Sequence, residues 1–443
     1  MKKLVINSKI NNFNKTISVD GDKSISIRSL LLGSQSYGIC KIKNLPNSED
    51  VLHTINGLRK LGVKITFNNN VCSITGNGLG SFKINNRVTI DAGNSGTFAR
   101  LLLGLLTKGT HKVKLIGDKS LSRRDFLRIS EPLQKFGSNF ILNNKGGLPI
   151  EIHATELIKP IQYKEIRGSA QCKSSVMLAA LNSPGKTIIE AKKSRDHTEL
   201  FFKYLKLPIK IKRKKEFDII QIEGEKQFCS FKYQIPGDIS SSSFFVVLTI
   251  LSKNSKLKIK NVNVNPSRIG YIKIINKMGG KVKIKNKRKV CGEYVGDLHI
   301  KSQKKIKSIN CPVKFNSNAI DEFLIIFLLA SKAKGVSKFS NLGELNKKES
   351  PRLKLGSNIL NMMGIKTVLK NNTLKIYGNP KLKIKKEIKI KNYYKDHRIF
   401  MTSVIGGLVT GGKWTIHDVN SYRSSFPSFM NILRKIGFNA TYR

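Results

Sequence analysis

The sequence predicts an α/β fold built by repeating one unit six times. Two observations support this prediction. First, one short motif recurs along the chain: an apolar residue, two spacer residues, a second apolar residue, a glycine and then a strand-like run. Examples are "LRKLGVKI" (58–65) and "LRKIGFNA" (433–440). Second, apolar helical runs begin at six matching places, near Ser24, Thr97, Ala170, Ser240, Ile320 and Asp396. Repeated units that combine helices with strands are typical of α/β proteins.

The glycine motif indicates where an amphipathic helix ends and a strand begins. A glycine at this place adopts the left-handed conformation that closes a helix. The predicted closing positions are 62, 137, 208, 279, 364 and 437. They lie 71 to 85 residues apart, and position 208 carries proline instead of glycine, in "YLKLPIKI" (204–211). Units of this length favour a compact three-plus-three arrangement over a solenoid.

Lysine alternates with apolar residues along many predicted strands, as in "KLKIKNVNVN" (256–265) and "KLKIKKEIKI" (381–390). Such alternation places lysine on the solvated face of a sheet. The 443-residue chain has 81 Lys and Arg against 28 Asp and Glu, a formal net charge of +53. This excess would suit nucleic acid, an anionic membrane or anionic small molecules. No basic block stands apart, so we expect neither a nucleic-acid nor a membrane partner.

The cysteines and the N-terminal segment exclude several other classes of protein. The six cysteines form no CxxC pair and no Cys/His cluster, which argues against a metal site or a disulfide framework. The start "MKKLVINSKINNF" lacks the apolar core of a signal peptide, and no apolar run approaches the ~18 residues of a spanning helix. We therefore expect a cytoplasmic monomer without a metal or cofactor.

Cationic side chains occur at the predicted helix starts, where the helix dipole makes them unfavourable by ~0.3–1 kcal/mol each. Lys23, Ser24 and Arg28 open the first buried helix, and "DAGNSGTFAR" (91–100) opens the second, with Thr97 as the expected N-cap and Arg100 in the first turn. The remaining helix starts, with Asp396 and Ser350 as expected N-caps and Pro351 at the first helical position, contribute Lys173, Arg398, Arg352, Arg268, Arg124 and Arg195. Free amides, serine hydroxyls and guanidiniums together bind phosphates and carboxylates. The pattern predicts a site for small molecules that carry several negative groups.

These same segments resemble the 5-enolpyruvylshikimate-3-phosphate synthases. The resemblance runs nearly end to end, in the order of the family's motifs. The motif sequences are most similar to those of the bacterial class II branch. It is carried by "DGDKSISIR", "GNSGTFAR", "GDKSLSRRDF", "SAQCKSSVMLAAL", "SRDHTE", "PGDISSSSFF", "NPSRIG", "IDEFLIIFLLA", "KKESPRL", "DHRIFM" and "SFPSF". Each segment alone is a weak signal, whereas the ordered set is highly specific.

The resemblance implies two inverted α/β-barrel domains, each of three βαβαββ units, with helix N-termini pointing into the cleft between them. One domain would comprise residues 1–20 and 240–443, and the other residues 21–239. The implied reaction transfers the enolpyruvyl group of phosphoenolpyruvate to the 5-hydroxyl of shikimate 3-phosphate, in aromatic amino acid biosynthesis. It proceeds by addition and elimination, releases phosphate and needs no metal or cofactor.

The resemblance also implies which residues bind and react. The residues implied to bind shikimate 3-phosphate are Lys23, Ser24, Arg28, Ser169, Ala170, Gln171, Arg195, Asp321 and Lys348. Those implied to bind phosphoenolpyruvate are Lys23, Gly96, Arg124, Gln171, Arg352 and Arg398. Asp321 would accept the hydroxyl proton, and Glu349 and Lys23 would complete the catalytic set.

The chain departs from the family pattern at Ile27, Asp125, Pro351 and Ser424. None of these changes removes a charged catalytic group, and Ile27 should face inward. Gly96 is the small residue that leaves room for glyphosate, so the resemblance implies sensitivity to that inhibitor.

Two alternatives remain from the residues alone. A UDP-N-acetylglucosamine enolpyruvyl transferase would need a cysteine in a mobile loop, whereas Cys72 lies in a strand-like run and Cys172 at a helix start. A basic RNA-binding protein or an RNA 3′-phosphate cyclase forms the other class. The cyclase would need a reactive histidine near the C-terminus, but His417 looks like a strand residue.

Overall fold

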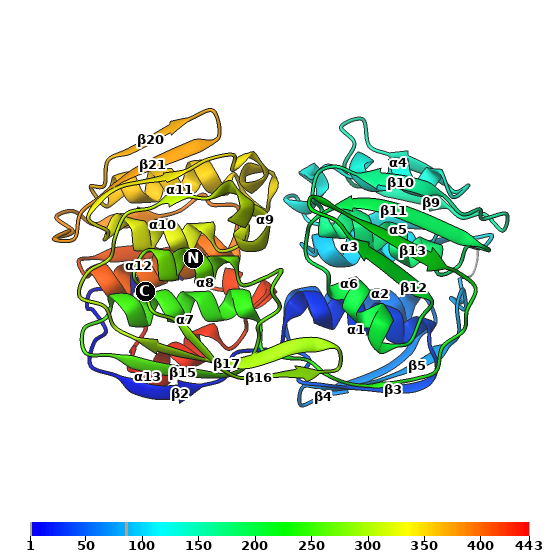
Figure 1. Cartoon of the computed structure of the whole chain (residues 1–443), viewed down its shortest axis with the longest axis horizontal. Helices are drawn as coiled ribbons and strands as arrows, with labels where there is room; N and C mark the ends of the chain where they lie inside the picture. The colour runs from blue at the N-terminus through cyan, green and yellow to red at the C-terminus, as the bar shows by residue number, and fades with distance from the viewer. Residues whose placement is uncertain (1, 85–86, 443) are drawn as a thin grey trace. The chain divides into compact units, whose positions relative to one another are not determined.

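A computed structural model describes residues 2–84 and 87–442. The chain divides into two compact units. Unit 1 comprises the chain up to Asp20, Pro236–Arg288 and everything from Tyr294, and unit 2 comprises Gly21–Ile235 and Lys289–Glu293. In Figure 1 the first segment, drawn in dark blue, lies with the later segments of unit 1.

Residues 236–239 correct the boundary expected from the sequence, which placed them with 21–235. They belong to unit 1 because the Gly237 amide donates to the carbonyl of Asn261 (2.8 Å). The Asp238 amide likewise donates to the carbonyl of Asp20 (2.8 Å). The turn Lys289–Glu293 also differs from the expectation, since its contacts group it with unit 2.

Among the described residues, the strands form six four-stranded sheets, which confirms the repeated unit. In each sheet one edge strand pairs in parallel with its neighbour. The sheets of unit 2 are β14 (Lys232–Gln234)–β3 (Tyr37–Lys43)–β5 (Val71–Asn77)–β4 (Lys64–Asn68), β6 (Arg87–Asp91)–β7 (Lys112–Ile116)–β9 (Ile150–His153)–β8 (Asn139–Leu142), and β10 (Gln162–Glu165)–β11 (Lys186–Lys192)–β13 (Phe217–Glu223)–β12 (Ile209–Arg213). Those of unit 1 are β16 (Lys283–Val290)–β17 (Glu293–Lys301)–β15 (Lys256–Asn263)–β2 (Asn14–Ile17), β18 (Asn310–Cys311)–β19 (Gly335–Phe339)–β21 (Thr373–Gly378)–β20 (Thr367–Lys370), and β22 (Ile388–Ile390)–β23 (Trp414–Ile416)–β1 (Leu4–Ile6)–β24 (Thr441–Tyr442).

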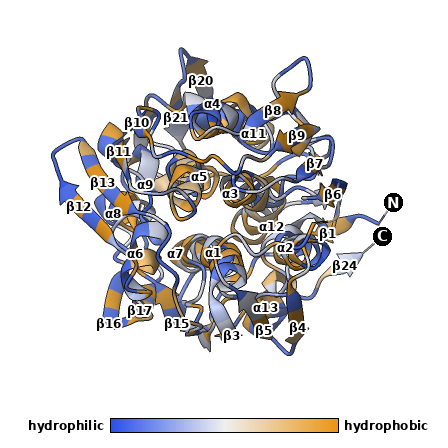
Figure 2. Cartoon of the chain, turned by 90° about the vertical axis from the view of Figure 1, so that its right-hand side faces the viewer, coloured by the Kyte–Doolittle hydropathy of each residue, from blue (hydrophilic) through white to orange (hydrophobic). Residues whose placement is uncertain are grey.

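The strands bury one face and expose lysine on the other. In β15, Leu257 and Ile259 are buried whereas Lys256 and Lys260 are exposed. Figure 2 shows this alternation as orange and blue bands along β12, β13 and β16. The prediction of a strand over 256–265 is confirmed for its first eight residues. The prediction over 381–390 is wrong except at Ile388–Ile390, because the rest of that lysine-rich segment pairs with no strand of the described chain.

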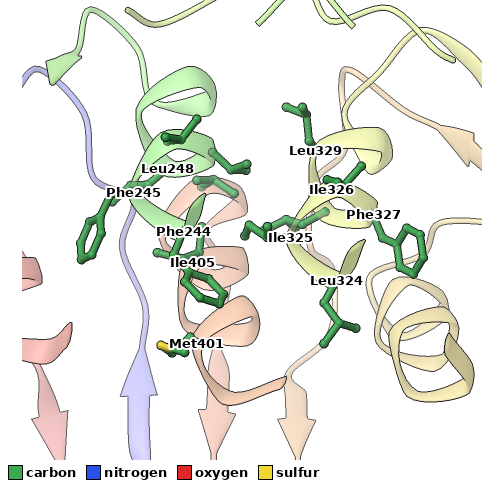
Figure 3. Close-up of a cluster of buried hydrophobic side chains, with 14 of the residues drawn as sticks. Phe244, Phe245, Leu248, Leu324, Ile325, Ile326, Phe327, Leu329, Met401 and Ile405 are labelled. Atoms are coloured by element: carbon green, nitrogen blue, oxygen red, sulfur yellow. The ribbon is translucent and has the colours of Figure 1, made fainter. Parts of the chain in front are cut away.

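Each unit has a core of helices that are buried on nearly every side. They are α1 (Lys23–Gln35), α3 (Gly96–Leu105) and α5 (Ala170–Ala180) in unit 2, and α7 (Ile239–Leu251), α10 (Phe323–Ser331) and α12 (His397–Thr410) in unit 1. Helices that are apolar all round must be covered by other elements. Figure 3 shows Phe244 of α7, Ile325 of α10 and Ile405 of α12 within one buried apolar cluster.

Amphipathic helices lie between these core helices and the solvent. They are α2 (Glu49–Lys60), α4 (Leu127–Gln134), α6 (His197–Tyr204), α8 (Gly270–Lys277), α11 (Arg352–Met362) and α13 (Phe429–Ile436). Shorter helical segments are α9 (Asn316–Ala319), η1 (Leu121–Arg123), η2 (Val313–Phe315), η3 (Gly343–Lys347) and η4 (Ser421–Ser424). No helix in the described ranges is long and apolar enough to cross a membrane.

The predicted closing glycines are confirmed at five positions. Positive φ angles of 82° to 114° occur at Gly62, Gly137, Gly279, Gly364 and Gly437. The prediction for position 208 is wrong. There the left-handed residue is Lys206 (φ 57°), two residues earlier, because proline fixes φ near −65°.

Candidate functional site

The N-termini of the buried helices of unit 2 lie at the same end of the core. The side-chain Nε2 of Gln171, at the start of α5, donates to Thr97 Oγ1 at the start of α3 (3.0 Å). Arg28 of α1 donates to Ser174 Oγ of α5 (3.0 Å). Side chains from separate repeats thus converge on one region, as the pattern of cations at helix starts predicts.

The caps of these helices are neutral or acidic side chains. Asp22 accepts from the Ile25 amide (3.0 Å), and Ser169 accepts from the Cys172 amide (3.3 Å). The prediction of Thr97 as the cap of α3 is wrong. Ser95 caps this helix by accepting from the Phe98 amide (3.3 Å), which leaves the Thr97 hydroxyl to accept from Gln171.

Arg28 is buried within a ring of neutral oxygen atoms. Its Nε donates to Thr198 Oγ1 (2.7 Å) and its Nη1 to the Ser24 carbonyl (3.0 Å), in addition to the bond with Ser174. Burial lowers the pKa of Arg28 to about 10, against the raising effect of the carboxylates of Glu199, Asp22 and Glu293. The guanidinium stays protonated and these hydrogen bonds all go to neutral oxygens, so it can also bind an anion.

Lys23 is oriented by a carboxylate of the neighbouring helix. Its Nζ lies 2.8 Å from Oδ2 of Asp50, in the first turn of α2. The two side chains are 16% and 6% exposed, so the ammonium group stays partly open to solvent. The ion pair fixes the flexible lysine stem in one direction.

Gly96 leaves room for the guanidinium of Arg124. A Cβ atom at Gly96 would lie 2.8 Å from Arg124 Nη1, which is too close for a real contact. Arg124 Nη2 donates to the side-chain Oδ1 of Asn94 in the preceding turn (2.8 Å). The turn, the glycine and the arginine therefore form one structural feature, at the start of α3.

The loop before α5 is organised by Glu165 at the end of β10. Its carboxylate accepts from the backbone amides of Arg167 (3.0 Å) and Ser169 (3.1 Å). Burial raises the pKa of Glu165, against the lowering effect of these amide bonds. Ser169 and Ala170 thereby receive a fixed backbone conformation at the helix start.

Unit 1 has its own convergence of helix starts. Arg398 Nη1, in the first turn of α12, donates to the carbonyl of Asp321, before α10 (3.0 Å). Ser240 at the start of α7 donates to the carboxylate of Glu322, which precedes α10. The prediction of Asp396 as the cap of α12 is confirmed, because it accepts from the Arg398 amide (2.9 Å).

Arg352 lies among the carboxylates of this unit. Its Nε and Nη2 bind the two oxygens of Asp396 (2.8 and 3.1 Å). Glu349 Oε2 lies 2.5 Å from Nη2, and Asp321 Oδ1 lies 3.4 Å from Nη1. Burial acts to lower the pKa of Arg352, but Asp396 and Glu349 outweigh it and raise the pKa above its usual value. Lys348 Nζ also lies 3.4 Å from Asp321 Oδ1.

Ser350 does not cap α11, which corrects another expectation. The helix begins at Arg352 with Pro351 as the cap residue, one position later than predicted. The Ser350 hydroxyl donates instead to Asp396 Oδ2 (2.7 Å), beside the guanidinium of Arg352. This serine therefore helps to hold the carboxylate.

The arginines of the two units differ in their direct partners. In unit 1, Arg352 binds the Asp396 carboxylate directly, whereas in unit 2 Arg28 and Arg100 bind neutral oxygens. Guanidiniums held in either way present donors to carboxylate and phosphate groups, and the carboxylates of unit 1 can in addition accept a proton. Among the described residues, no group of His, Cys, Asp and Glu is arranged to hold a metal ion.

The departures from the family pattern have simple structural explanations. Ile27 is fully buried, which confirms that it faces inward. Asp125 accepts from Arg128 Nε (3.0 Å), and Ser424 donates to the Ser421 carbonyl (3.0 Å).

The structure disfavours a reactive thiol at Cys72 or Cys172, as the first alternative would need. Burial raises the pKa of Cys72 to about 12, and it also raises the pKa of Cys172, so both thiols stay protonated. The prediction of His417 as a strand residue is wrong by one position, because β23 ends at Ile416. The His417 carbonyl accepts from the Tyr393 hydroxyl (2.5 Å).

Three site residues were not among those chosen from the sequence. Asp50 gave no signal, because an acidic residue in the first turn of a helix is ordinary. The sequence indicates Asp396 as a cap but not as the partner of Arg352. It places Arg100 in the first turn of α3 without indicating a partner, which in the structure is Gln171 Oε1 (2.5 Å).

Comparison with known proteins agrees with this geometry. Residues 7–433 match the family model of EPSP synthase (3-phosphoshikimate 1-carboxyvinyltransferase). The chain is 37% identical over 440 residues to the 3-phosphoshikimate 1-carboxyvinyltransferase of Ruthia magnifica, covering 99% of each chain. An EPSP synthase from Acinetobacter baumannii has a similar structure (TM-score 0.86, 32% identity, 100% of each chain). The enolpyruvyl transferase NikO from Streptomyces tendae shares the fold (TM-score 0.75, 12% identity, 100% of this chain and 99% of that one).

Proposed function

Because the chain belongs to the EPSP synthase family, we propose that it transfers the enolpyruvyl group of phosphoenolpyruvate to the 5-hydroxyl of shikimate 3-phosphate. Phosphate is released, and the product continues toward aromatic amino acids. The observation that carries the proposal is the family match across residues 7–433. The convergence of cationic helix starts in each unit supports it, because both substrates are multiply charged anions.

Shikimate 3-phosphate is assigned mainly to the helix starts of unit 2. Arg28 offers a buried guanidinium that is held in place by bonds to neutral oxygens. The full set comprises Lys23, Ser24, Arg28, Ser169, Ala170, Gln171 and Arg195, together with Asp321 and Lys348 of unit 1. The fixed amides of the Ser169 turn and the serine hydroxyls would bind the phosphate oxygens.

Phosphoenolpyruvate is assigned to guanidiniums that are already fixed in place. Arg352 is held by Asp396, and Arg124 lies against Gly96. The full set comprises Lys23, Gly96, Arg124, Gln171, Arg352 and Arg398. Fixed cations bind carboxylate and phosphate groups without first losing side-chain freedom.

The reaction needs a base for the hydroxyl and an acid for the methylene carbon. Asp321 accepts the proton of the 5-hydroxyl of shikimate 3-phosphate. At the same time the oxygen of this hydroxyl forms a bond to C2 of phosphoenolpyruvate. Glu349 or Lys23 donates a proton to C3, which gives a tetrahedral ketal phosphate. Loss of a proton from C3 then expels phosphate and restores the methylene group. The position of Asp321 beside Lys348 and Arg352 supports its role, because these two ion pairs hold its carboxylate in one place among the cations assigned to the substrates.

The protein is proposed to act as a cytoplasmic monomer, with no nucleic-acid or membrane partner. Its activity requires two small anions and no resident cofactor. The positive surface would then serve solubility and the attraction of substrates.

A phosphate-release assay tests the proposed function. The purified protein is incubated with phosphoenolpyruvate and either shikimate 3-phosphate or UDP-N-acetylglucosamine. We expect release only with shikimate 3-phosphate. Release only with the sugar nucleotide would support the alternative transferase. Release with neither acceptor would overturn the proposal and favour the RNA-directed alternative.

A further inference from the structure

The strongest observation outside the proposed contact residues is the buried guanidinium of Arg100, in the first turn of α3. Its Nη1 donates to Gln171 Oε1 (2.5 Å), and its Nη2 donates to the carbonyl of Asp125 (3.1 Å). The group lies over the ring of Phe126, 5.2 Å from its centroid. Arg100 as a whole is 9% exposed.

The burial of Arg100 is unfavourable for the fold alone. Its Nε is buried without a hydrogen-bond partner. Burial lowers the pKa of Arg100 to about 10, and the nearby Arg124 and Arg128 lower it further. An apolar residue would avoid the desolvation of this charge. A costly charge in this place therefore indicates a role other than packing.

The bonds of Gln171 indicate that role. A guanidinium only donates hydrogen bonds, so the Gln171 atom that faces Arg100 must be the carbonyl oxygen. The amide nitrogen of Gln171 then points the other way, where it donates to Thr97 Oγ1 (3.0 Å). A nitrogen of this type carries a second proton, which stays available to an acceptor. Without Arg100, the two ends of the amide could exchange places.

We propose that Arg100 is a positioning residue that fixes the amide of Gln171 so that Gln171 donates a hydrogen bond to the anionic substrates. This inference rests on the proposed function, in which Gln171 contacts both substrates. Arg100 itself need not touch either one. A donor at this place attracts anionic oxygens, whereas a flipped amide would present a carbonyl oxygen and repel them.

A double-mutant cycle separates action through Gln171 from a general effect of charge. KM for both substrates and kcat are measured by phosphate release for the parent, Arg100→Met, Gln171→Ala and the double variant. We expect Arg100→Met to raise KM about tenfold, since the loss of one oriented hydrogen bond changes affinity by roughly this factor. In the Gln171→Ala background the same substitution should change KM less than twofold.

Arg128→Met is the matched control. Arg128 is 8% exposed, carries the same charge close to Arg100, and binds Asp125 rather than serving Gln171 in this proposal. We expect it to change KM less than threefold. Arg100→Lys keeps a donor-only group, so it should restore most of the affinity. If Arg100→Met does not fold, the cycle is run with Arg100→Lys. The smaller KM increase that Arg100→Lys causes should disappear when Gln171→Ala is also present.

Three results would overturn the inference while the parent remains active. They are equal KM increases from Arg100→Met in both backgrounds, an equal increase from Arg128→Met, or a cycle with Arg100→Lys in which the effects add. A parent that releases no phosphate with shikimate 3-phosphate would instead overturn the proposed function, and this inference with it.

Discussion

Gly96 shows how one missing methyl group determines the shape of a binding site. A Cβ atom there would meet the end of the Arg124 side chain at 2.8 Å, which can shift aside. Gly104, on the same helix, differs because its Cβ would lie 2.2 Å from the Ser175 carbonyl oxygen, which belongs to the backbone. The two glycines therefore have different roles within one element.

We predict that Gly96→Ala raises KM for phosphoenolpyruvate about tenfold, because the displaced guanidinium loses roughly 1.4 kcal/mol of binding free energy. Its melting temperature should stay near that of the parent. Glyphosate should inhibit the parent in competition with phosphoenolpyruvate, and should inhibit Gly96→Ala less strongly. Gly104→Ala is the contrasting variant, and overpacking should cost it about 1–3 kcal/mol of stability. Steady-state kinetics and thermal unfolding of both variants check this, and unchanged inhibition of Gly96→Ala would contradict it.

Asp396 provides a prediction on pH. Burial acts to raise the pKa of Asp396, but Arg352 outweighs it, so the pKa in the folded protein lies below its usual 3.8. A depressed carboxyl pKa stabilises the fold above the unfolded pKa, and this contribution is lost as pH falls through the folded pKa. Asp396→Asn should therefore lose about 3–5 kcal/mol near pH 7, the typical cost of breaking a buried ion pair. The difference from the parent should shrink below about pH 4, measured by urea unfolding at each pH. A difference that does not change with pH would show that the charge of Asp396 contributes nothing.

At the scale of elements, helix ends were the most predictable feature of the fold. Gly364 and Gly437 could be placed from the sequence because few other residues tolerate a left-handed helix end. The shift to Lys206 could not be predicted, since proline removed the glycine signal without indicating which residue replaces it. Similarly, both Ser95 and Thr97 are residue types that cap helices, and the geometry of the turn places Ser95 in the cap position.

The candidate site was predictable where charge contradicted the helix dipole, as at Lys23 and Arg28. Partners such as Asp50 and the orienting bond from Arg100 to Gln171 depend on which helices pack together. Hydrophobic periodicity in the sequence indicates that a helix is buried but not which neighbour it meets.

The left-handed backbone at Lys206 and Gly364 affects the free energy of unfolding. We predict that Lys206→Gly raises the free energy of unfolding by about 0.5–1 kcal/mol, because an exposed side chain no longer strains the backbone. Gly364→Ala should lower it by about 1 kcal/mol, although nothing lies within 4 Å of the added Cβ atom. Urea unfolding of both variants measures these changes, and effects of the same sign would refute the assignment.

At the scale of the whole molecule, the dominant property is the net charge of +53. A positive field concentrates anionic substrates near the protein and is screened by salt, with a Debye length of about 10 Å at 0.1 M. We predict that kcat/KM falls severalfold between about 0.02 and 0.3 M NaCl, while kcat changes less. At saturating shikimate 3-phosphate, most of the effect of salt on the reaction rate should disappear. A kcat/KM independent of salt would show that the surface lysines do not assist substrate capture.

The central claim is that cations at the helix starts bind two anionic metabolites for reaction. The turnover of Lys23→Met with phosphoenolpyruvate and shikimate 3-phosphate tests it most directly, with Lys41→Met, an exposed lysine of β3, as the control. We expect Lys23→Met to lose at least about 100-fold in kcat/KM, because a charge-assisted contact worth roughly 3 kcal/mol is removed. Lys41→Met should keep the parent rate. A Lys23→Met protein that turns over as fast as the parent would contradict the claim.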